Sequence, residues 1–267
     1  MIKPYGLNVI RVAVSLALFW FIWLIERTRN AQAQKPGIKK AHIVRFFWCG
    51  LMGVAINQML FIKGLTMTST IHASLLMLST PLLIAFFAFL ILKEKITILK
   101  SVGLALGIGG AILLITAKEG SGEQDSWLWG DLLVILNAIS YAIYFIIVKP
   151  LMKEYHPVHV IRWIFTFGLV MILPFGWMQF SEIHWHQFSN LDFAALGFIV
   201  ICGTFLAYIF NVLGIKNLGA GITGSYIYTQ PAFTAIIAVF FLNEVLDLQK
   251  IIAAILIFAG VFLVTKS

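Results

Sequence analysis

Apolar stretches separated by short polar clusters extend from one end of the chain to the other. Each stretch has about 18 to 25 residues, the length that an α-helix needs to cross roughly 30 Å of hydrocarbon. A membrane-spanning β-strand would instead alternate apolar and polar residues over about ten positions. The pattern predicts nine spanning helices, at residues 6–25, 42–63, 70–92, 98–117, 128–149, 159–178, 192–214, 220–242 and 248–265.

Composition supports lipid as the solvent of this chain. Of its 267 residues, 61% are hydrophobic and 11% are charged, and the mean hydropathy is +0.96. The formal net charge of +8 does not indicate nucleic-acid binding, because Lys and Arg lie mostly beside span ends, where they set topology. The fold class that we expect is an all-α polytopic membrane protein, with connections too short to form a soluble domain.

Basic residues also predict orientation. If loop 26–41 is cytoplasmic, about fourteen of the nineteen Lys and Arg fall on that side. The positive-inside rule then places the C-terminus in the cytoplasm of an inner (plasma) membrane protein. A cleavable signal peptide is an alternative for the first 33 residues, but the charged segment 26–29 disfavours cleavage there.

The chain resembles itself when it is shifted by 150 positions. Without a gap from residue 53 to 116, the shift pairs Gly53 with Gly203, Gly64 with Gly214, Pro81 with Pro231, Leu92 with Leu242, Glu94 with Glu244, Lys100 with Lys250 and Gly110 with Gly260. A shift of 151 pairs residues 9–11 with 160–162, both reading Val-Ile-Arg. This is the pattern of a duplicated bundle.

The two copies differ in their number of helices. We expect a first repeat of four helices at 1–117, a connecting loop at 118–127, and a second repeat of five helices at 128–267. Because five is odd, two complete copies would lie inverted in the membrane, as in transporters that alternate access around a midplane site. The expectation is that the first repeat lacks its first helix, through a gene start assigned too late or a truncation.

Each copy ends in a mid-span proline, a glutamate thirteen residues later, a turn and a glycine-containing helix: Pro81, Glu94 and Gly110, then Pro231, Glu244 and Gly260. This arrangement resembles the EamA-type repeat of the drug/metabolite transporter superfamily, over essentially the whole chain. The resemblance implies a ten-helix inverted-repeat bundle, here without its first helix, around a central substrate cavity between the halves.

The two prolines and two glutamates are candidate hinge or gate residues. Pro81 and Pro231 each remove a helix hydrogen bond, which either provides a hinge or fixes a kink for packing. Glu94 and Glu244 either cap or pair near the next helix, or take part in a gate. Gly103, Gly107 and Gly110 form a small-residue stripe, for which we expect close helix packing.

Polar side chains within the spans are the candidates for lining a substrate cavity, since each must find a partner or face water. They are Asn57, Ser79, Thr80, Asn137, Tyr141, Tyr144, Tyr208, Asn211, Tyr226, Tyr228 and Gln230. For each of them, hydrogen bonding between helices is the alternative to substrate contact. No carboxylate lies at the middle of a span, so no proton or sodium relay is predicted, and His72 is interpreted as an interfacial histidine.

These features predict export of small metabolites or amino acids by alternating access between two inverted repeats. The alternatives are a non-transporting scaffold or inactive partner subunit and an intramembrane enzyme, although no base–nucleophile pair or paired aspartates occur within the spans. We expect a small-molecule substrate and the lipid bilayer as partners, with no cofactor, metal or nucleic acid. Oligomeric state is not predicted.

Overall fold

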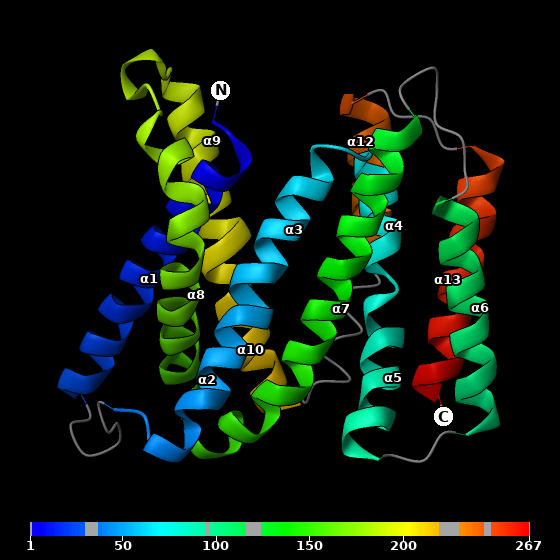
Figure 1. The fold of residues 1–267 in the computed structure, drawn as a ribbon, viewed down its shortest axis with the longest axis horizontal. Helices are drawn as coiled ribbons and strands as arrows, with labels where there is room; N and C mark the ends of the chain where they lie inside the picture. The colour runs from blue at the N-terminus through cyan, green and yellow to red at the C-terminus, as the bar shows by residue number, and fades with distance from the viewer. Residues whose placement is uncertain are drawn as a thin grey trace. The chain divides into compact units, whose positions relative to one another are not determined.

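The computed structural model describes residues 2–29, 37–93, 97–115, 124–218, 230–242 and 247–266. These residues are helical apart from short connections, with no strand among them (Figure 1). The helices are α1 Pro4–Arg29, η1 Lys40–His42, α2 Ile43–Gly50, η2 Leu51–Ala55, α3 Ile56–Leu65, α4 Thr70–Met77, α5 Thr80–Leu92, α6 Ile98–Ile115, α7 Gln124–Glu154, α8 Pro157–Ser181, η3 Trp185–Gln187, α9 Asn190–Val200, η4 Ile201–Leu206, α10 Ala207–Leu218, α12 Gln230–Leu242 and α13 Leu248–Lys266.

The predicted all-α membrane architecture is confirmed. Seven helical segments of the described chain are long and apolar enough to cross a membrane, and two shorter apolar helices lie at 233–242 and 248–264. Large apolar side chains are exposed along them, such as Ile98 at 85%, Phe241 at 78% and Phe240 at 76%. Such surfaces suit hydrocarbon as the solvent.

Two of the long spans contain a wider, π-helical segment. The segment η2 joins α2 to α3, and η4 joins α9 to α10. A shift of 150 places residues 51–55 on 201–205, so the two π-helical segments occupy equivalent positions in the two copies. Such segments are rare and occur frequently at functional sites.

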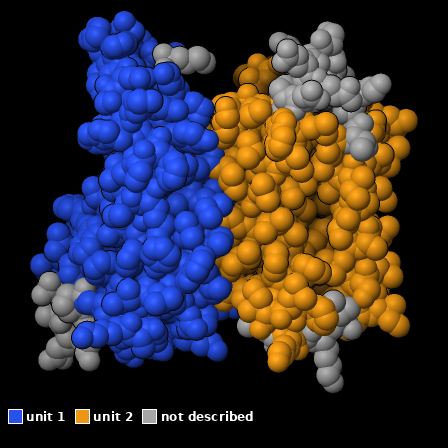
Figure 2. Space-filling model, viewed as in Figure 1, with its two compact units in different colours: residues 1–59, 147–220 blue, residues 60–146, 221–267 orange. Residues whose placement is uncertain are grey.

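The chain divides into two compact units, coloured separately in Figure 2. Unit 1 contains residues 1–59 and 147–220, and unit 2 contains residues 60–146 and 221–267. Each unit therefore combines segments from both halves of the sequence.

In unit 1, α1 packs against α8 through glycines. A Cβ atom at Gly6 would lie 2.9 Å from the Gln179 carbonyl oxygen, and one at Gly176 would lie 2.8 Å from the Tyr5 carbonyl oxygen. The start of α1 thus meets the end of α8, and Trp23 late in α1 contacts Arg162 early in α8, so the two helices run antiparallel. The Gln179 side chain accepts hydrogen bonds from the amides of Tyr5 and Gly6, at 2.9 and 3.3 Å, which satisfies two free amides at the start of α1.

In unit 2, α6 and α13 are also antiparallel and in close contact. A Cβ at Gly103 would lie 2.6 Å from the Gly260 carbonyl oxygen, and one at Gly110 would lie 2.9 Å from the Ala253 carbonyl oxygen. A Cβ at Gly107 would instead collide with Leu82 of α5. The glycine stripe is therefore a packing face, as predicted.

Ion pairs at the helix ends of unit 1 are exposed. Lys3 Nζ lies 2.6 Å from Glu182 Oε2, and Lys39 Nζ lies 2.7 Å from Glu154 Oε2. The hydrogen bond to Glu154 raises the pKa of Lys39. Pairs of this kind contribute little to stability.

Candidate functional site

The predicted cavity residues are divided between the two units. Unit 1 contains Asn57, Tyr208 and Asn211, and unit 2 contains Ser79, Thr80, Asn137, Tyr141, Tyr144 and Gln230. The remaining candidates, Tyr226, Tyr228, Glu94 and Glu244, lie outside the described residues.

A hydrogen-bonded group in unit 1 links the two π-helical spans. The Tyr208 hydroxyl donates to the Gly53 carbonyl oxygen within η2 at 3.1 Å and accepts from Gln58 Nε2 at 3.1 Å. Gln58 and Tyr208 occupy equivalent repeat positions, 150 residues apart. In this structure, Tyr208 therefore makes the bond between helices that was the alternative to substrate contact.

Arg11 lies beside the same group. Its Nε donates to Thr204 Oγ1 in η4 at 2.9 Å. The Thr204 hydroxyl in turn donates to the Ile199 carbonyl oxygen at 3.2 Å. Asn57, the neighbour of Gln58 on α3, is 8% exposed, whereas Asn211 on α10 is half-buried.

Arg162, the repeat equivalent of Arg11, is fully buried in unit 1. Its guanidinium carbon lies 3.6 Å from the ring centre of Trp23 and 4.5 Å from that of Trp20. Its Nη2 lies 2.8 Å from Nδ1 of His159, which must accept because an arginine only donates. Cation–π contacts stabilise this buried charge.

In unit 2, the cavity candidates Asn137, Tyr141 and Tyr144 lie on α7. The rings of Tyr141 and Tyr144 stack with their centroids 5.8 Å apart, and Tyr141 also meets Phe145 edge-on at 4.8 Å. Asn137 and Tyr144 are each 1% exposed, and Tyr141 is half-buried. Of these three candidates, only Tyr141 presents appreciable surface.

The helical path is irregular before Pro81, although Leu78 and Ser79 keep right-handed helical dihedral angles. Helix α4 ends at Met77, the turn Leu78–Ser79 follows, and α5 begins at Thr80, so Pro81 lies in the first turn of a new helix. Proline is well accommodated there, because the first amides of a helix have no partner within it. The Ser79 hydroxyl donates to the Leu76 carbonyl oxygen at 2.6 Å, and Thr80 is fully buried.

Pro231 is likewise the second residue of its described helix, α12, which begins at Gln230. The polar residue at this helix start, Gln230, is exposed.

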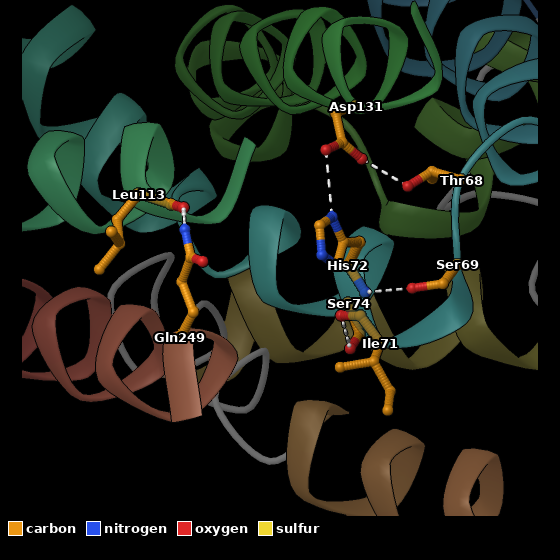
Figure 3. A network of polar contacts seen from close by, with 8 residues as sticks. All are labelled: Thr68, Ser69, Ile71, His72, Ser74, Leu113, Asp131 and Gln249. Carbon is orange, nitrogen blue, oxygen red and sulfur yellow. Dashed lines mark hydrogen bonds and ion pairs between the residues drawn. The ribbon is translucent and has the colours of Figure 1, made fainter. Parts of the chain in front are cut away.

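A buried network in unit 2 was not predicted. Asp131 of α7 accepts a hydrogen bond from the Thr68 hydroxyl through Oδ1, and its Oδ2 lies 3.1 Å from Nδ1 of His72 on α4 (Figure 3). Both side chains are nearly inaccessible, at 3% for Asp131 and 2% for His72. His72 lies near the start of its span, as predicted, but its side chain is buried against Asp131. The sequence feature that could have indicated this network is Asp131, an acidic residue at the fourth position of the predicted span 128–149.

The family of the chain follows from its sequence match. Residues 1–116 and 128–266 each match the EamA-like transporter family. The chain belongs to this family. EamA-like proteins are transporters, and the chain is accordingly a multi-pass membrane protein of the transporter class rather than an enzyme.

Individual relatives agree with the family. An uncharacterized transporter of Archaeoglobus fulgidus is 24% identical over 99% of this chain and 88% of its own length. The Bacillus subtilis uncharacterized transporter YyaM is 27% identical over 84% of this chain and 75% of its own length. The Arabidopsis thaliana protein WALLS ARE THIN 1 is 23% identical over 99% of this chain and 74% of its own length.

A solved crystal structure has the same fold. It superposes with a TM-score of 0.65 at 17% identity, covering 100% of this chain and 89% of the other. At this identity the likeness concerns the fold alone. A solved protein therefore shares the overall fold of this chain.

Proposed function

We propose that this EamA-like protein exports small polar or zwitterionic metabolites, amino acids among them, by alternating access between two inverted repeats. The membrane is the inner (plasma) membrane, and the C-terminus is cytoplasmic, as the distribution of Lys and Arg favours. Residues 1–117 and 128–267 form the two repeats, joined by 118–127.

The observation that carries this proposal is the antiparallel packing of equivalent helices. Helices α1 and α8 correspond under the repeat, as do α6 and α13, and each pair runs in opposite directions within its own unit. The matched π-helical segments η2 and η4 add a second duplicated feature. Two inverted copies can present the same structure to opposite faces of a membrane, which is what alternating access requires.

Polar side chains at the described positions support a polar substrate. Tyr141, Asn211 and Gln230 have exposed surface and carry hydroxyl or amide groups that can bond to a carboxylate or an ammonium group. Tyr144 is only 1% exposed, and the Tyr208 hydroxyl is already bonded to Gln58 and to the Gly53 carbonyl oxygen, so these two candidates are less able to meet a solute.

Release of solutes from cells and from vesicles tests the proposal. Cells that overproduce the protein should accumulate specific metabolites in the medium, and vesicles containing purified protein should release the same compounds. Tyr141→Ala and Gln230→Ala should reduce release at unchanged protein level, while Trp129→Ala, at an exposed position on α7, serves as the matched control. Absence of release from both cells and vesicles would favour the scaffold alternative.

A further inference from the structure

Arg11 places a positive charge inside the span 4–26 of unit 1. The side chain is half-buried, and its Nε donates to Thr204 Oγ1 at 2.9 Å. Neither of its Nη atoms forms a hydrogen bond or ion pair with a described residue. A charge within a span is costly unless it meets an opposite charge or water, and such residues are typically functional.

The described carboxylates of unit 1 do not pair with Arg11. They are Glu26, Glu154, Glu182 and Asp192. The three glutamates lie near lysine or histidine at helix ends, and Asp192 belongs to the capping box of α9. The guanidinium of Arg11 therefore has no described counter-charge in its own unit.

A polar stripe that includes Arg11 on α1 recurs on α8. The shift of 151 places residues 8–15 on 159–166, which read Asn-Val-Ile-Arg-Val-Ala-Val-Ser and His-Val-Ile-Arg-Trp-Ile-Phe-Thr. The first, fourth and eighth residues are polar in both segments, and this spacing puts them on one face of a helix. Asn8, Arg11 and Ser15 are termed the α1 stripe, and His159, Arg162 and Thr166 the α8 stripe.

The α8 stripe is completed within the protein. His159 Nδ1 accepts from Arg162 Nη2 at 2.8 Å, and tryptophan rings of α1 cover the guanidinium. The Thr166 hydroxyl donates to the Arg162 carbonyl oxygen at 2.8 Å and accepts from Trp20 Nε1 at 3.3 Å. This copy of the stripe is therefore a packing contact between α1 and α8.

The α1 stripe is not completed in the same way. Asn8 and Ser15 are fully buried, and neither the Asn8 amide group nor the Ser15 hydroxyl forms a hydrogen bond with a described residue. Val12 stands at the position of Trp163, so this copy lacks that aromatic ring. Buried polar groups without partners are destabilising, and in native structures they point to a bound water, ion or ligand.

We propose that the α1 stripe binds the carboxylate group of the transported solute, with Arg11 as the residue that contacts it. Because Nε already donates to Thr204, both Nη groups remain for the two carboxylate oxygens, and paired N–H donors match this group. Asn8 and Ser15, one turn to either side, add an amide and a hydroxyl donor on the same helix face. The inference rests on the proposed transport function for the identity of the solute, whereas the anion site is testable without transport.

The charge of the site favours a carboxylate over a phosphate group. Arg11 contributes one positive charge, and the basic residue that precedes α1, Lys3, is exposed and paired with Glu182. A carboxylate carries a single negative charge at neutral pH, whereas a phosphate monoester carries roughly two. One guanidinium thus neutralises a carboxylate but not a phosphate.

Binding is measured first, because it needs no transport. Purified full-length protein in dodecyl maltoside micelles, which contain no phosphate, is heated at constant ionic strength, and the fraction that remains soluble is measured by size-exclusion chromatography. The probes are sodium propionate, sodium benzoate and an equimolar mixture of the twenty L-amino acids. At a concentration about ten times its dissociation constant, at least one of them should raise the unfolding midpoint by about 2–5 °C, whereas propionamide and benzamide should not.

Variants of Arg11 decide whether the shift arises at the α1 stripe. Arg11→Gln should abolish it, and Arg11→Lys, which keeps the charge but loses the paired donors, should lose at least half of it and decides the matter if the glutamine variant does not fold. The matched control is Arg45→Gln, at an exposed arginine of the same unit, which should keep the full shift. A carboxylate shift that both Arg11 variants retain, or no shift from any carboxylate, overturns the proposal.

Asn8→Leu separates a binding role from a structural one. Leucine has a similar size and removes the unpartnered amide, so the midpoint without ligand should stay equal or rise while the carboxylate shift becomes smaller. A lower midpoint without ligand, together with an unchanged shift, would make Asn8 a structural residue and contradict its place in the site.

Other anions that a guanidinium recognises are tested in the same assay. Inorganic phosphate and phosphatidylglycerol are added separately to the micelles, the first as a free phosphate and the second as a lipid headgroup. Each should stabilise the wild type less than the best carboxylate does. A larger shift with either of them, lost in Arg11→Gln, contradicts the carboxylate assignment.

The two proposals fail differently. If carboxylates bind in a manner that depends on Arg11 while neither cells nor vesicles release solute, the site stands and the export function fails. If the wild type and Arg11→Lys release amino acids at equal rates and no carboxylate shifts the midpoint, the export function stands and the site is wrong.

Discussion

Replacing Gly103 with alanine should destabilise the α6–α13 contact. The new Cβ would lie 2.6 Å from the Gly260 carbonyl oxygen and 2.8 Å from a methyl carbon of Val264. Ordinary contact begins at 3.4 Å, so the two backbones must separate locally by about 0.8 Å. Overpacking of this size costs about 1–3 kcal/mol. Gly260 forms the other side of the same contact, so Gly260→Ala, whose Cβ would lie 2.5 Å from the Gly103 carbonyl oxygen, should cause a similar loss.

The assay is thermal unfolding in lipid nanodiscs, followed by tryptophan fluorescence. The midpoint should fall by roughly 2–10 °C for Gly103→Ala and Gly260→Ala. Gly109→Ala is the matched control on the same helix, because a Cβ there meets no atom within 4 Å. A midpoint for Gly103→Ala equal to that of the wild type, or a comparable fall for Gly109→Ala, would refute the packing argument.

Two further substitutions test the buried groups of unit 1. Tyr208→Phe removes the hydrogen bonds to Gly53 and Gln58, and should lower stability by about 1–2 kcal/mol, measured by the same unfolding assay; no change would show that these bonds are replaced by others. Arg162→Lys keeps the charge but loses the flat stacking on Trp23, so it should lower the unfolding midpoint, and a midpoint at or above that of the wild type would contradict the cation–π account.

The span architecture could be predicted from the sequence because the length and hydrophobicity of each segment determine it locally. The predicted spans 42–63 and 98–117 correspond closely to the observed 40–65 and 98–115. The glycine stripe on α6 could be interpreted correctly for a related reason, since small residues at helical spacing have few other uses in lipid.

The polar contacts could not be predicted, because they depend on which distant helices meet. His72 and Asp131 are 59 residues apart, and no motif links them. Arg162 is stabilised by Trp20 and Trp23 of another helix, and no local sequence pattern around Arg162 indicates these partners. At Pro81, local sequence predicted a backbone irregularity but not whether the helix would bend or end.

Labelling of equivalent helix starts from each side of the membrane tests the inverted repeats most directly. Ile98 and Leu248, 150 positions apart, begin α6 and α13 and are 85% and 72% exposed. Ile98→Cys and Leu248→Cys are each made in a background with Cys49 and Cys202 replaced by alanine, and are treated with a membrane-impermeant maleimide. The account predicts that intact cells label position 248 and inside-out vesicles label position 98. Labelling of both positions from one side would contradict it.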